Sequence, residues 1–563
     1  MSVGSRAFLI FSFMSALESC LPVERVYPPR LIFMSLTGKS LLAGQPGAPG
    51  GATFRAINPA TGETLAPDFH EASLGEVDTA LQAAARAFED YRERPAATRA
   101  QLLEAIATEI EALGETLLQR AHAETGLPLA RLTGERARTC GQLRLFAAVV
   151  RDGSWVDARI DPALPERQPL PRPDLRRMLI ALGPVVVFGS SNFPFAFSVA
   201  GGDTASALAA GCPVIVKAHR AHAGTAELVG QAVVRAVAAC ALPAGLFSLV
   251  HGGGASVGIA MVKHPATTAV GFTGSHAAGR ALCDAAAARP HPIPVFAEMS
   301  SLNPVFLLPG AVRERGAAIA TGLLGSFTLG VGQFCTKPGL VLVQRGAETD
   351  AFLQALAAGV QGATCATMLT PGIRTAFEEN RQKVTALEGV TVLATAQAAP
   401  VAQKTEGQPS VALTSAANFL KHPELATEAF GPFTLVVRAE TPAELLACAR
   451  ALEGQLTATL HGNAEDLAAA GTLVALLEQK AGRLVINAFP TGVEVSHAMH
   501  HGGPSPAASD ARFTSVGTAA LLRFARPVCY QGFPAALLPV ALQDANPLGL
   551  MRLVNGVRTT APL

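Results

Sequence analysis

A cysteine in a glycine-containing segment could serve as a nucleophile. Cys335 follows small residues in the segment 330–334, and small residues permit close approach of the backbone to a ligand. A thiolate there could add to a carbonyl if the pKa of the thiol were lowered and backbone N–H groups faced the oxyanion. A buried structural cysteine is the alternative interpretation, and the local sequence leaves both open.

Two further side chains could act beside this nucleophile, one as a general base and one as a donor to an oxyanion. Glu298 lies beside an apolar, strand-like run, where partial desolvation is expected to raise its pKa toward neutrality and make it a general base. Asn192 follows a buried strand, where α/β proteins gather ligand contacts, and its amide could donate to an oxyanion. A solvated carboxylate and an ordinary turn asparagine are the alternatives, because sequence separation does not link either residue to Cys335.

Cofactor contacts are expected at other strand ends. Lys217 ends the run 213–216, where a cation could hold ribose hydroxyls or phosphate. Gly274 and Ser275 follow a strand and precede a helix expected over 276–288, so their N–H groups could meet a pyrophosphate. A solvated lysine and a plain helix cap are the alternatives.

Two other patterns point to different chemistry. The segment 254–258 matches the G-x-S-x-G elbow in a strand-to-helix context, which keeps a serine hydrolase using Ser256 open. His497, His500 and His501 could share a helix face, but no glutamate stands at motif spacing, so no metal site is expected.

The elements around these residues follow an α/β pattern. An Ala-rich helical segment covers 73–125, and a proline-rich stretch over 161–173 indicates a connector or projecting hairpin. Short Val/Ile-rich runs alternate with helical stretches and predict parallel sheets. The first set of runs is 184–188, 213–216, 246–251, 268–272 and 304–307, and the second includes 340–343, 433–438 and 483–487.

Composition narrows the partner to a small molecule. The 563 residues carry 44 Lys and Arg against 43 Asp and Glu, which argues against nucleic-acid or membrane-surface binding. No apolar run reaches the ~20 residues of a membrane span. The nine cysteines are scattered without a C-x-x-C pair, which favours a reducing compartment and a cytoplasmic location. The first 33 residues differ in character and are expected to be a disordered or non-native extension.

In this order and spacing, the segments from about Met34 onward resemble the aldehyde dehydrogenase superfamily. The resemblance implies Cys335 as nucleophile, Glu298 as general base and Asn192 as oxyanion donor, with a thiohemiacetal and a thioester as intermediates. This superfamily binds its dinucleotide without the G-x-G-x-x-G fingerprint, which is absent from this chain. The implied cofactor contacts are Lys217 at the adenosine ribose, Gly274 and Ser275 at the pyrophosphate, and Glu428 and Phe430 at the nicotinamide and its ribose.

The resemblance also implies a domain plan. We expect a Rossmann-like NAD(P)-binding domain over 34–155 and 181–299 and an α/β catalytic domain over 300–488. Residues 156–180 and 489–563 are expected to form an oligomerisation arm and tail. A homodimer or homotetramer is therefore predicted.

Several stretches, including 201–207, 298–304, 490–495 and 526–531, resemble the branch that oxidises α-ketoglutaric semialdehyde (2,5-dioxopentanoate) to 2-oxoglutarate. An aldehyde dehydrogenase for fatty or aromatic aldehydes is the alternative. An acidic substrate needs cationic or donor-rich contacts, for which Arg138, Gln142 and Arg144 are candidates.

One departure from many relatives concerns the cofactor. Three positions after Lys217, where an acidic residue often holds both adenosine-ribose hydroxyls, this chain has Arg220. A cation there could pair with a 2′-phosphate, so NADP is the expected preference and NAD remains usable.

Overall fold

The computed structural model describes residues 35–401 and 403–563. The extension predicted over residues 1–33 lies outside the described residues. The chain divides into two units, Met1–Ser35 and Leu36–Leu563, and the architecture below is that of the second unit.

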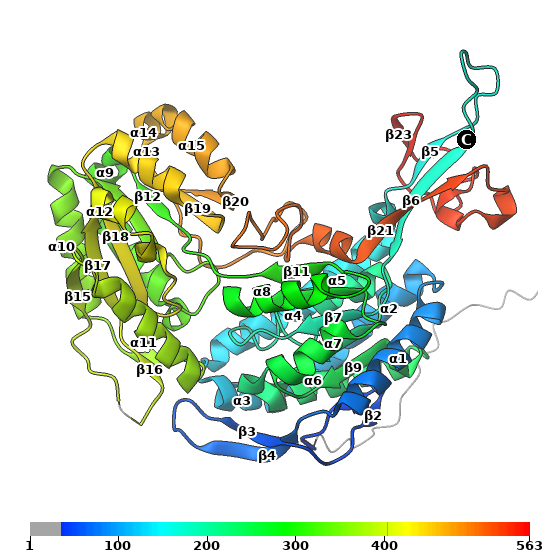
Figure 1. Ribbon diagram of the computed structural model, residues 1–563, viewed down its shortest axis with the longest axis horizontal. Helices are drawn as coiled ribbons and strands as arrows, with labels where there is room; N and C mark the ends of the chain where they lie inside the picture. Colours follow the sequence, from blue (N-terminus) through cyan, green and yellow to red (C-terminus); the bar gives the residue numbers. More distant parts are fainter. Residues whose placement is uncertain (1–34, 402) are drawn as a thin grey trace, which may run out of the picture. The chain divides into compact units, whose positions relative to one another are not determined.

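The first large sheet contains a parallel set of strands in which β7 is flanked by β10 and β8 (Figure 1). Its central strands are buried along their whole length, as expected when helices cover both faces of a parallel sheet. The predicted runs 184–188, 213–216, 246–251 and 268–272 are thereby confirmed as strands. The fifth run of that set, 304–307, is also a strand, but it belongs to the second large sheet. From one edge to the other the strands are β11 (Val295–Glu298), β10 (Ala269–Thr273), β7 (Val185–Phe188), β8 (Val214–Lys217), β9 (Phe247–Val250), β1 (Leu41–Leu42) and β2 (Gln45–Pro46).

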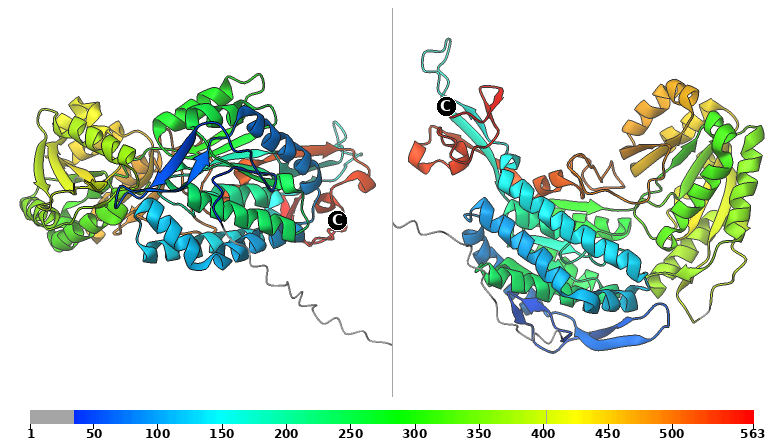
Figure 2. Two further views of the ribbon diagram at one scale, coloured as in Figure 1. Left: turned by 90° about the horizontal axis from the view of Figure 1, so that it is seen from below. Right: turned by 180° about the vertical axis from the view of Figure 1, so that it is seen from behind.

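Helices cover both faces of this sheet. Helices α7 and α8 lie in front of it in Figure 1, whereas α2 and α4 come to the front in the view from behind in Figure 2. Helix α1 begins with a capping box between Ser73 and Glu76, and its Val77 and Leu81 pack into a core shared with strand residues such as Val186. The helices are α1 (Leu74–Tyr91), α2 (Ala96–Ala112), α3 (Gly114–Thr125), α4 (Leu129–Asp152), α5 (Gly202–Ala210), α6 (Ala223–Ala239), α7 (Ile259–Lys263) and α8 (His276–Ala287).

A second large sheet follows in the sequence, and it is parallel except for its edge strand β15. This sheet confirms the second predicted set of strands. Its order is β15 (Thr391–Thr395), β17 (Ser410–Ser415), β18 (Phe433–Ala439), β13 (Leu340–Gln344), β12 (Val305–Leu307), β19 (Gln455–His461) and β20 (Ala481–Ile486). The helices of this region are α9 (Pro309–Thr328), α10 (Ala347–Gln361), α11 (Pro371–Thr385), α12 (Ala416–Lys421), α13 (Pro442–Ala451), α14 (Ala464–Ala469) and α15 (Gly471–Glu478).

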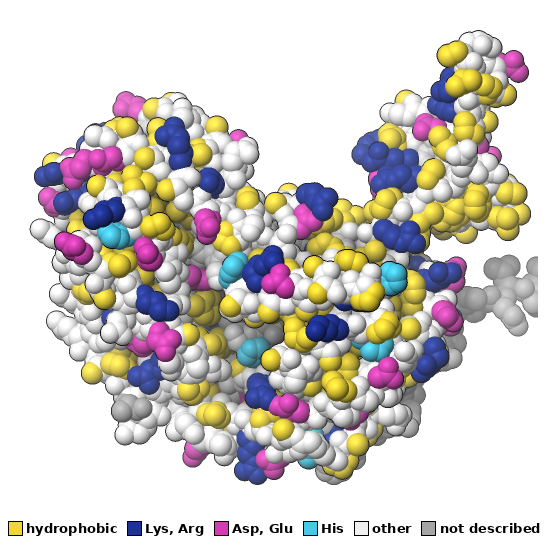
Figure 3. Space-filling view, in the orientation of Figure 1, with side chains coloured by type: hydrophobic (Ala, Val, Ile, Leu, Met, Phe, Trp, Pro, Cys, Tyr) yellow, Lys and Arg dark blue, Asp and Glu magenta, His cyan; other side chains and the backbone are white. Residues whose placement is uncertain are grey.

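A third sheet joins the proline-rich region to the C-terminal segment and extends away from the two large sheets (Figures 1 and 2). The stretch 161–173 forms the projecting hairpin that the sequence indicated, closed by a bridge between Leu164 and Arg172. Apolar side chains gather on this sheet and its loops (Figure 3). The strand order is β21 (Ala525–Gln531), β6 (Leu175–Ala181), β5 (Arg159–Asp161), β22 (Arg552–Val554) and β23 (Val557–Thr559).

Two small antiparallel pairs complete the strands of the described residues. They are β3 (Thr53–Ile57) with β4 (Thr64–His70), and β14 (Ala366–Thr367) with β16 (Glu406–Gly407). Over the described ranges, none of the helices combines the length and the apolar character that crossing a membrane would require.

Candidate active site

Cys335 lies in a tightly packed turn between α9 and β13. The glycine-containing segment before it has left-handed backbone at Gly330 and Gly332, where φ is 55° and 68°. A Cβ at Gly332 would stand 2.2 Å from the carbonyl oxygen of Gly431, so only glycine fits there without displacing the backbone. The close approach expected from the small residues is therefore real, and it joins the Cys335 turn to the loop that carries Glu428 and Phe430.

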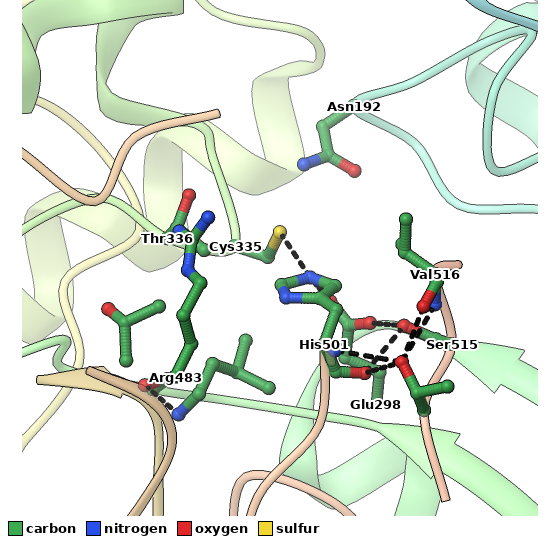
Figure 4. Close-up of polar contacts among 12 residues, drawn as sticks. Asn192, Glu298, Cys335, Thr336, Arg483, His501, Ser515 and Val516 are labelled. Carbon is green, nitrogen blue, oxygen red and sulfur yellow. Dashed lines mark hydrogen bonds and ion pairs between the residues drawn. The ribbon is translucent and has the colours of Figure 1, made fainter. Parts of the chain in front are cut away.

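Three reactive side chains converge at this turn (Figure 4). The Sγ atom of Cys335 lies 3.4 Å from Nε2 of His501, and the same nitrogen lies 2.9 Å from Oε1 of Glu298. Ser515 donates its hydroxyl to the other carboxylate oxygen of Glu298. Glu298 comes from the end of β11, whereas His501 and Ser515 come from an irregular segment far along the chain. The structure thus links Glu298 to Cys335, which the sequence could not do.

The protonation behaviour of Glu298 differs from the sequence expectation. Burial by itself raises the pKa of Glu298, but the charge of His501 and hydrogen bonds from His501, Ser515 and Cys335 outweigh it, so that the pKa lies below its ordinary value. The predicted rise toward neutrality was wrong, because the partners that stabilise the carboxylate are distant in sequence. Glu298 is an anion at neutral pH and is ready to accept a proton.

The pKa of the Cys335 thiol is raised well above its ordinary value. Burial is the main cause, and the neighbouring carboxylate of Glu298 adds to it, while Arg138 and Arg483 act in the opposite direction. Cys335 therefore needs a nearby group to hold its proton before it can act as a nucleophile.

Asn192 lies at the same centre. It follows β7, and its Nδ2 donates to the backbone carbonyl of Gln333, two residues before Cys335, at 3.0 Å. Its own backbone carbonyl accepts a hydrogen bond from Arg131 at 2.7 Å, which fixes the turn. The structure thus brings Asn192, Glu298 and Cys335 together.

The arginines near Cys335 include one predicted from the sequence and one that was missed. Arg138 on α4 is largely buried, its Nη1 lacks a hydrogen-bond partner among the described residues, and its charge interacts with Cys335 and Glu494. Arg483 on β20 points toward Cys335 in Figure 4 and donates to the backbone carbonyls of Pro490 and Gly492. Two positive charges therefore flank the thiol.

The other two candidate substrate contacts, Gln142 and Arg144, have different surroundings from Arg138. Gln142 is buried, and its side-chain amide lies against Gly202. Arg144 lies at the surface, where it forms a two-pronged ion pair with Glu111 at 2.6 and 2.7 Å. Because its guanidinium is already paired at the surface, Arg144 is not one of the residues that the structure brings to Cys335.

The predicted contacts with the adenosine half of a dinucleotide gather at the ends of β8 and β9. Lys217 is buried at the end of β8, its ammonium donates only to the carbonyl of Ala218 among the described residues, and burial lowers its pKa to about 8. Arg220 pairs with Glu71 and stacks on the ring of Phe54 at 4.7 Å. The Arg220 side chain remains half exposed.

Buried nitrogens without partners stand close to Lys217. In the described chain, neither ring nitrogen of His251 has a hydrogen-bond partner, and the same holds for Nδ1 of His222. Buried polar groups normally have partners, so unpartnered ones mark a place where a polar ligand or water belongs. The hydroxyl of Ser190 is unpartnered as well. These residues fit the polar half of a dinucleotide.

The remaining cofactor candidates are placed by neighbouring elements. The N–H of Gly274, which was expected to face a pyrophosphate, instead donates to the carbonyl of Glu298 at 3.0 Å, and Ser275 caps helix α8 by accepting from Ala278. A Cβ at Gly274 would stand 2.6 Å from the Phe272 ring. The pyrophosphate turn and Glu298 are therefore directly connected.

Glu428 and Phe430 lie on the loop that packs against Gly332. The carboxylate of Glu428 contacts Ser300, and burial raises its pKa despite the opposing charge of Lys337. Lys337, two residues after Cys335, donates to the carbonyls of Ala429 and Phe433 and so holds this loop in place.

Two residues of the site that the sequence did not indicate, His501 and Ser515, come from irregular backbone, and a third, Arg483, lies on β20. His501 was considered only with His497 and His500 on one helix face, but this segment is not helical. His497 is exposed beside Thr518 at 3.3 Å, whereas His501 is fully buried. No local pattern marks His501, Ser515 or Arg483, because their roles depend on tertiary contacts. The elbow residue Ser256 is exposed within a π-helical turn over Gly254–Gly258.

Comparisons with known proteins agree with this arrangement. The model of the aldehyde dehydrogenase family matches residues 48–510. The chain is 55% identical over 526 residues to alpha-ketoglutaric semialdehyde dehydrogenase 2 of Azospirillum brasilense, covering 93% of this chain and 99% of that protein. It is 47% identical over 523 residues to the alpha-ketoglutaric semialdehyde dehydrogenase of Acinetobacter baylyi, with the same two coverages.

Solved structures show the same fold. Betaine aldehyde dehydrogenase from Staphylococcus aureus, in complex with NAD+, superposes with a TM-score of 0.75 at 21% identity, covering 90% of this chain and 99% of that one. An NADP-dependent enzyme from E. coli gives a TM-score of 0.73 at 22% identity and covers 88% and 98%. The family match spans most of the chain, and the chain therefore belongs to the aldehyde dehydrogenase family, whose reaction is the NAD(P)-dependent oxidation of an aldehyde to a carboxylate through a cysteine-bound thioester.

Proposed function

We propose that this enzyme oxidises α-ketoglutaric semialdehyde to 2-oxoglutarate, with Cys335 as the nucleophile. The observation that carries the proposal is the cluster of Cys335, Glu298 and His501, flanked by the charges of Arg138 and Arg483. The names of the two relatives above support the substrate, because both match nearly the whole chain.

The chemistry follows from the placement of these groups. The Cys335 thiolate adds to the aldehyde carbon, and the Asn192 amide with the Cys335 backbone N–H stabilises the oxyanion of the thiohemiacetal. A bound nicotinamide would supply the hydride acceptor, and loss of hydride from the thiohemiacetal would leave a thioester on Cys335. Glu298, held as an anion by Ser515 and His501, then removes a proton from the water that hydrolyses the thioester.

The substrate's carboxylate requires cationic contacts. Arg138 offers a buried Nη1 that has no partner in the described chain, and Arg483 offers a second guanidinium whose charge also interacts with Cys335. A charge-assisted hydrogen bond to a carboxylate would satisfy the orphaned nitrogen. Gln142, the third candidate contact, has a buried amide nitrogen without a hydrogen-bond partner in the described chain. Arg144 has no part in this proposal.

The cofactor would lie across the strand ends of the first sheet. Lys217 is proposed to bind the adenosine ribose, Gly274 and Ser275 the pyrophosphate, and Glu428 and Phe430 the nicotinamide end. Arg220 would pair with a 2′-phosphate and favour NADP. The carboxylate of Glu71 beside it opposes that charge, so the expected preference is modest and NAD is used as well.

The third sheet is proposed to join subunits in a homodimer or homotetramer. Exposed apolar side chains cluster on it and on the loops around it, which is typical of an interaction surface (Figure 3). They include Leu164, Leu170, Phe533, Leu537, Val540, Leu548, Met551 and Val557.

A cytoplasmic location is proposed as well. All cysteines in the part of the chain that the structure describes are free thiols, as is usual in a reducing compartment.

Steady-state kinetics test the proposed reaction. Cofactor reduction should be measured with α-ketoglutaric semialdehyde, a fatty aldehyde and an aromatic aldehyde, each with NADP and NAD. Cys335→Ala is expected to abolish turnover, and Ser256→Ala, the matched control, to leave it unchanged. A wild-type enzyme that prefers neutral aldehydes would overturn the substrate, and an active Cys335→Ala variant would overturn the nucleophile.

A further inference from the structure

His501 faces the two groups that the proposed reaction uses. Its Nε2 is 3.4 Å from Sγ of Cys335 and 2.9 Å from Oε1 of Glu298. The imidazole is fully buried, and its backbone is held by neighbours: its N–H donates to Thr514 Oγ1 at 2.8 Å, and its carbonyl accepts from the N–H of Ser515 at 2.8 Å. The backbone that carries the ring is therefore held in place by the fold.

The geometry restricts where a proton can reside. Nε2 lies 2.9 Å from a carboxylate oxygen that has no hydrogen-bond partner in the described chain, and a negative charge this close stabilises a proton on the ring. A proton on Nε2 is attracted by both Glu298 and the sulfur. The carboxylate cannot turn away, because Ser515 holds its other oxygen. The site therefore favours a protonated Nε2 between the two groups.

We infer that His501 is a further catalytic residue, which takes onto Nε2 the proton that Cys335 must lose. The Sγ–H bond breaks and an Nε2–H bond forms as the sulfur attacks, so that the proton of the buried thiol passes to a ring nitrogen 3.4 Å away. The inference rests on the proposed role of Cys335 as the nucleophile. It requires no metal ion, oxidant or other reactant.

This arrangement divides the work between two bases. His501 keeps its proton while the thioester exists and donates the same N–H to the sulfur when the thiolate leaves again. Glu298 remains free to accept a proton from water during hydrolysis. A small hollow is lined by both residues, together with Asp510 and Thr514.

Other charges also act on the thiol. Glu298 on β11 disfavours the thiolate, whereas Arg138 on α4 and Arg483 on β20 favour it. Burial disfavours the charge of Arg138, whereas Glu135 and, with a smaller effect, Glu494 favour it. Without the imidazole, the arginines alone must offset both burial and Glu298, so a thiolate should become rare at neutral pH.

Alkylation of Cys335 tests the inference without substrate or cofactor. The rate of modification by iodoacetamide should be followed against pH in the full-length protein, with Cys335 identified by peptide mass and the exposed Cys529 as internal reference. Wild type should react at a lower pH than the raised pKa of the buried thiol alone would allow, because His501 takes the proton. His501→Asn should react at least about tenfold more slowly at pH 7, with its profile displaced to higher pH. His497→Asn, an exposed histidine of the same segment, should match wild type.

A second variant separates proton transfer from hydrogen bonding. His501→Gln keeps an N–H donor near the position of Nε2 but cannot take a proton, so its alkylation profile should also move to higher pH. In His501→Gly, added free imidazole should restore the reactivity of Cys335. A wild-type alkylation profile in folded His501→Asn or His501→Gln would overturn the inference. An active Cys335→Ala variant would instead overturn the proposed function, and the two failures are therefore distinguishable.

Discussion

The two halves of the site differ in what their buried polar groups contact. Around Cys335, the thiol, Glu298 and His501 contact one another, although Oε1 of Glu298 and Nδ1 of His501 have no hydrogen-bond partner in the described chain. Around Lys217, both ring nitrogens of His251 lack partners in the described chain. The reacting groups are thus preorganised by each other, whereas the cofactor side is left to be completed by what binds there.

The largest effect on turnover is expected from removing the general base Glu298. Glu298→Gln should lower kcat by about 100-fold or more while one equivalent of cofactor is still reduced in the first turnover, because only thioester hydrolysis needs this base. Rapid-mixing kinetics measure both quantities. A variant that loses the first turnover as completely as later ones would show that Glu298 serves acylation instead.

The same carboxylate sets a pH dependence. Because the pKa of Glu298 lies below its ordinary value, the carboxylate stays ionised as pH falls through the usual range for glutamate. The acid limb of kcat that belongs to Glu298 is therefore expected below that range. Ser515→Ala removes one hydrogen bond to the charged form and should move this limb to higher pH. An acid limb near neutrality in wild type would contradict the assignment.

On the cofactor side, replacing the buried Lys217 should stabilise the cofactor-free protein. Burial lowers the pKa of Lys217 from 10.5 to about 8, which corresponds to about 3 kcal/mol of destabilisation at neutral pH. The unfolded chain binds more protons between these values, so this contribution to stability increases as pH rises from 8 to 10.5. Lys217→Met should raise the melting temperature of the cofactor-free protein at pH 7 and weaken cofactor binding.

Thermal unfolding at pH 7 and pH 10, with and without cofactor, checks this prediction. The stabilisation by Lys217→Met should shrink at the higher pH. Lys337, whose pKa is also about 8, remains in both proteins and cancels in the comparison. Equal melting temperatures of wild type and variant at both pH values would contradict the proposed cost of burial.

The smallest expected effects concern cofactor choice at the half-exposed Arg220. Arg220→Ala should raise KM for NADP roughly five- to tenfold and change KM for NAD little, since only NADP offers a 2′-phosphate. Glu71→Gln should do the reverse by removing the opposing charge. Equal responses of both cofactors to Arg220→Ala would place the 2′-position elsewhere.

Sequence patterns predicted the regular parts well and the irregular parts poorly. The strand ends that carry Glu298, Asn192 and Lys217 could be placed because Val/Ile-rich runs are buried on both faces. His501 could not, because its position depends on contacts between residues 166 positions apart and on a segment without periodicity. The pKa of Glu298 was misjudged for the same reason. The stretch over 489–563, expected to form arm and tail, in fact contributes His501 and Ser515 to the site.

The contact of Gly332 with Gly431 couples two turns that are far apart in the sequence. One glycine precedes Cys335, the other follows Phe430, and a Cβ on the first would meet the backbone of the second at 2.2 Å. A methyl group at Gly332 would push apart the turns that hold the nucleophile and the proposed nicotinamide contacts. In a library of variants, a tolerated substitution in one turn should therefore occur together with a compensating substitution in the other turn.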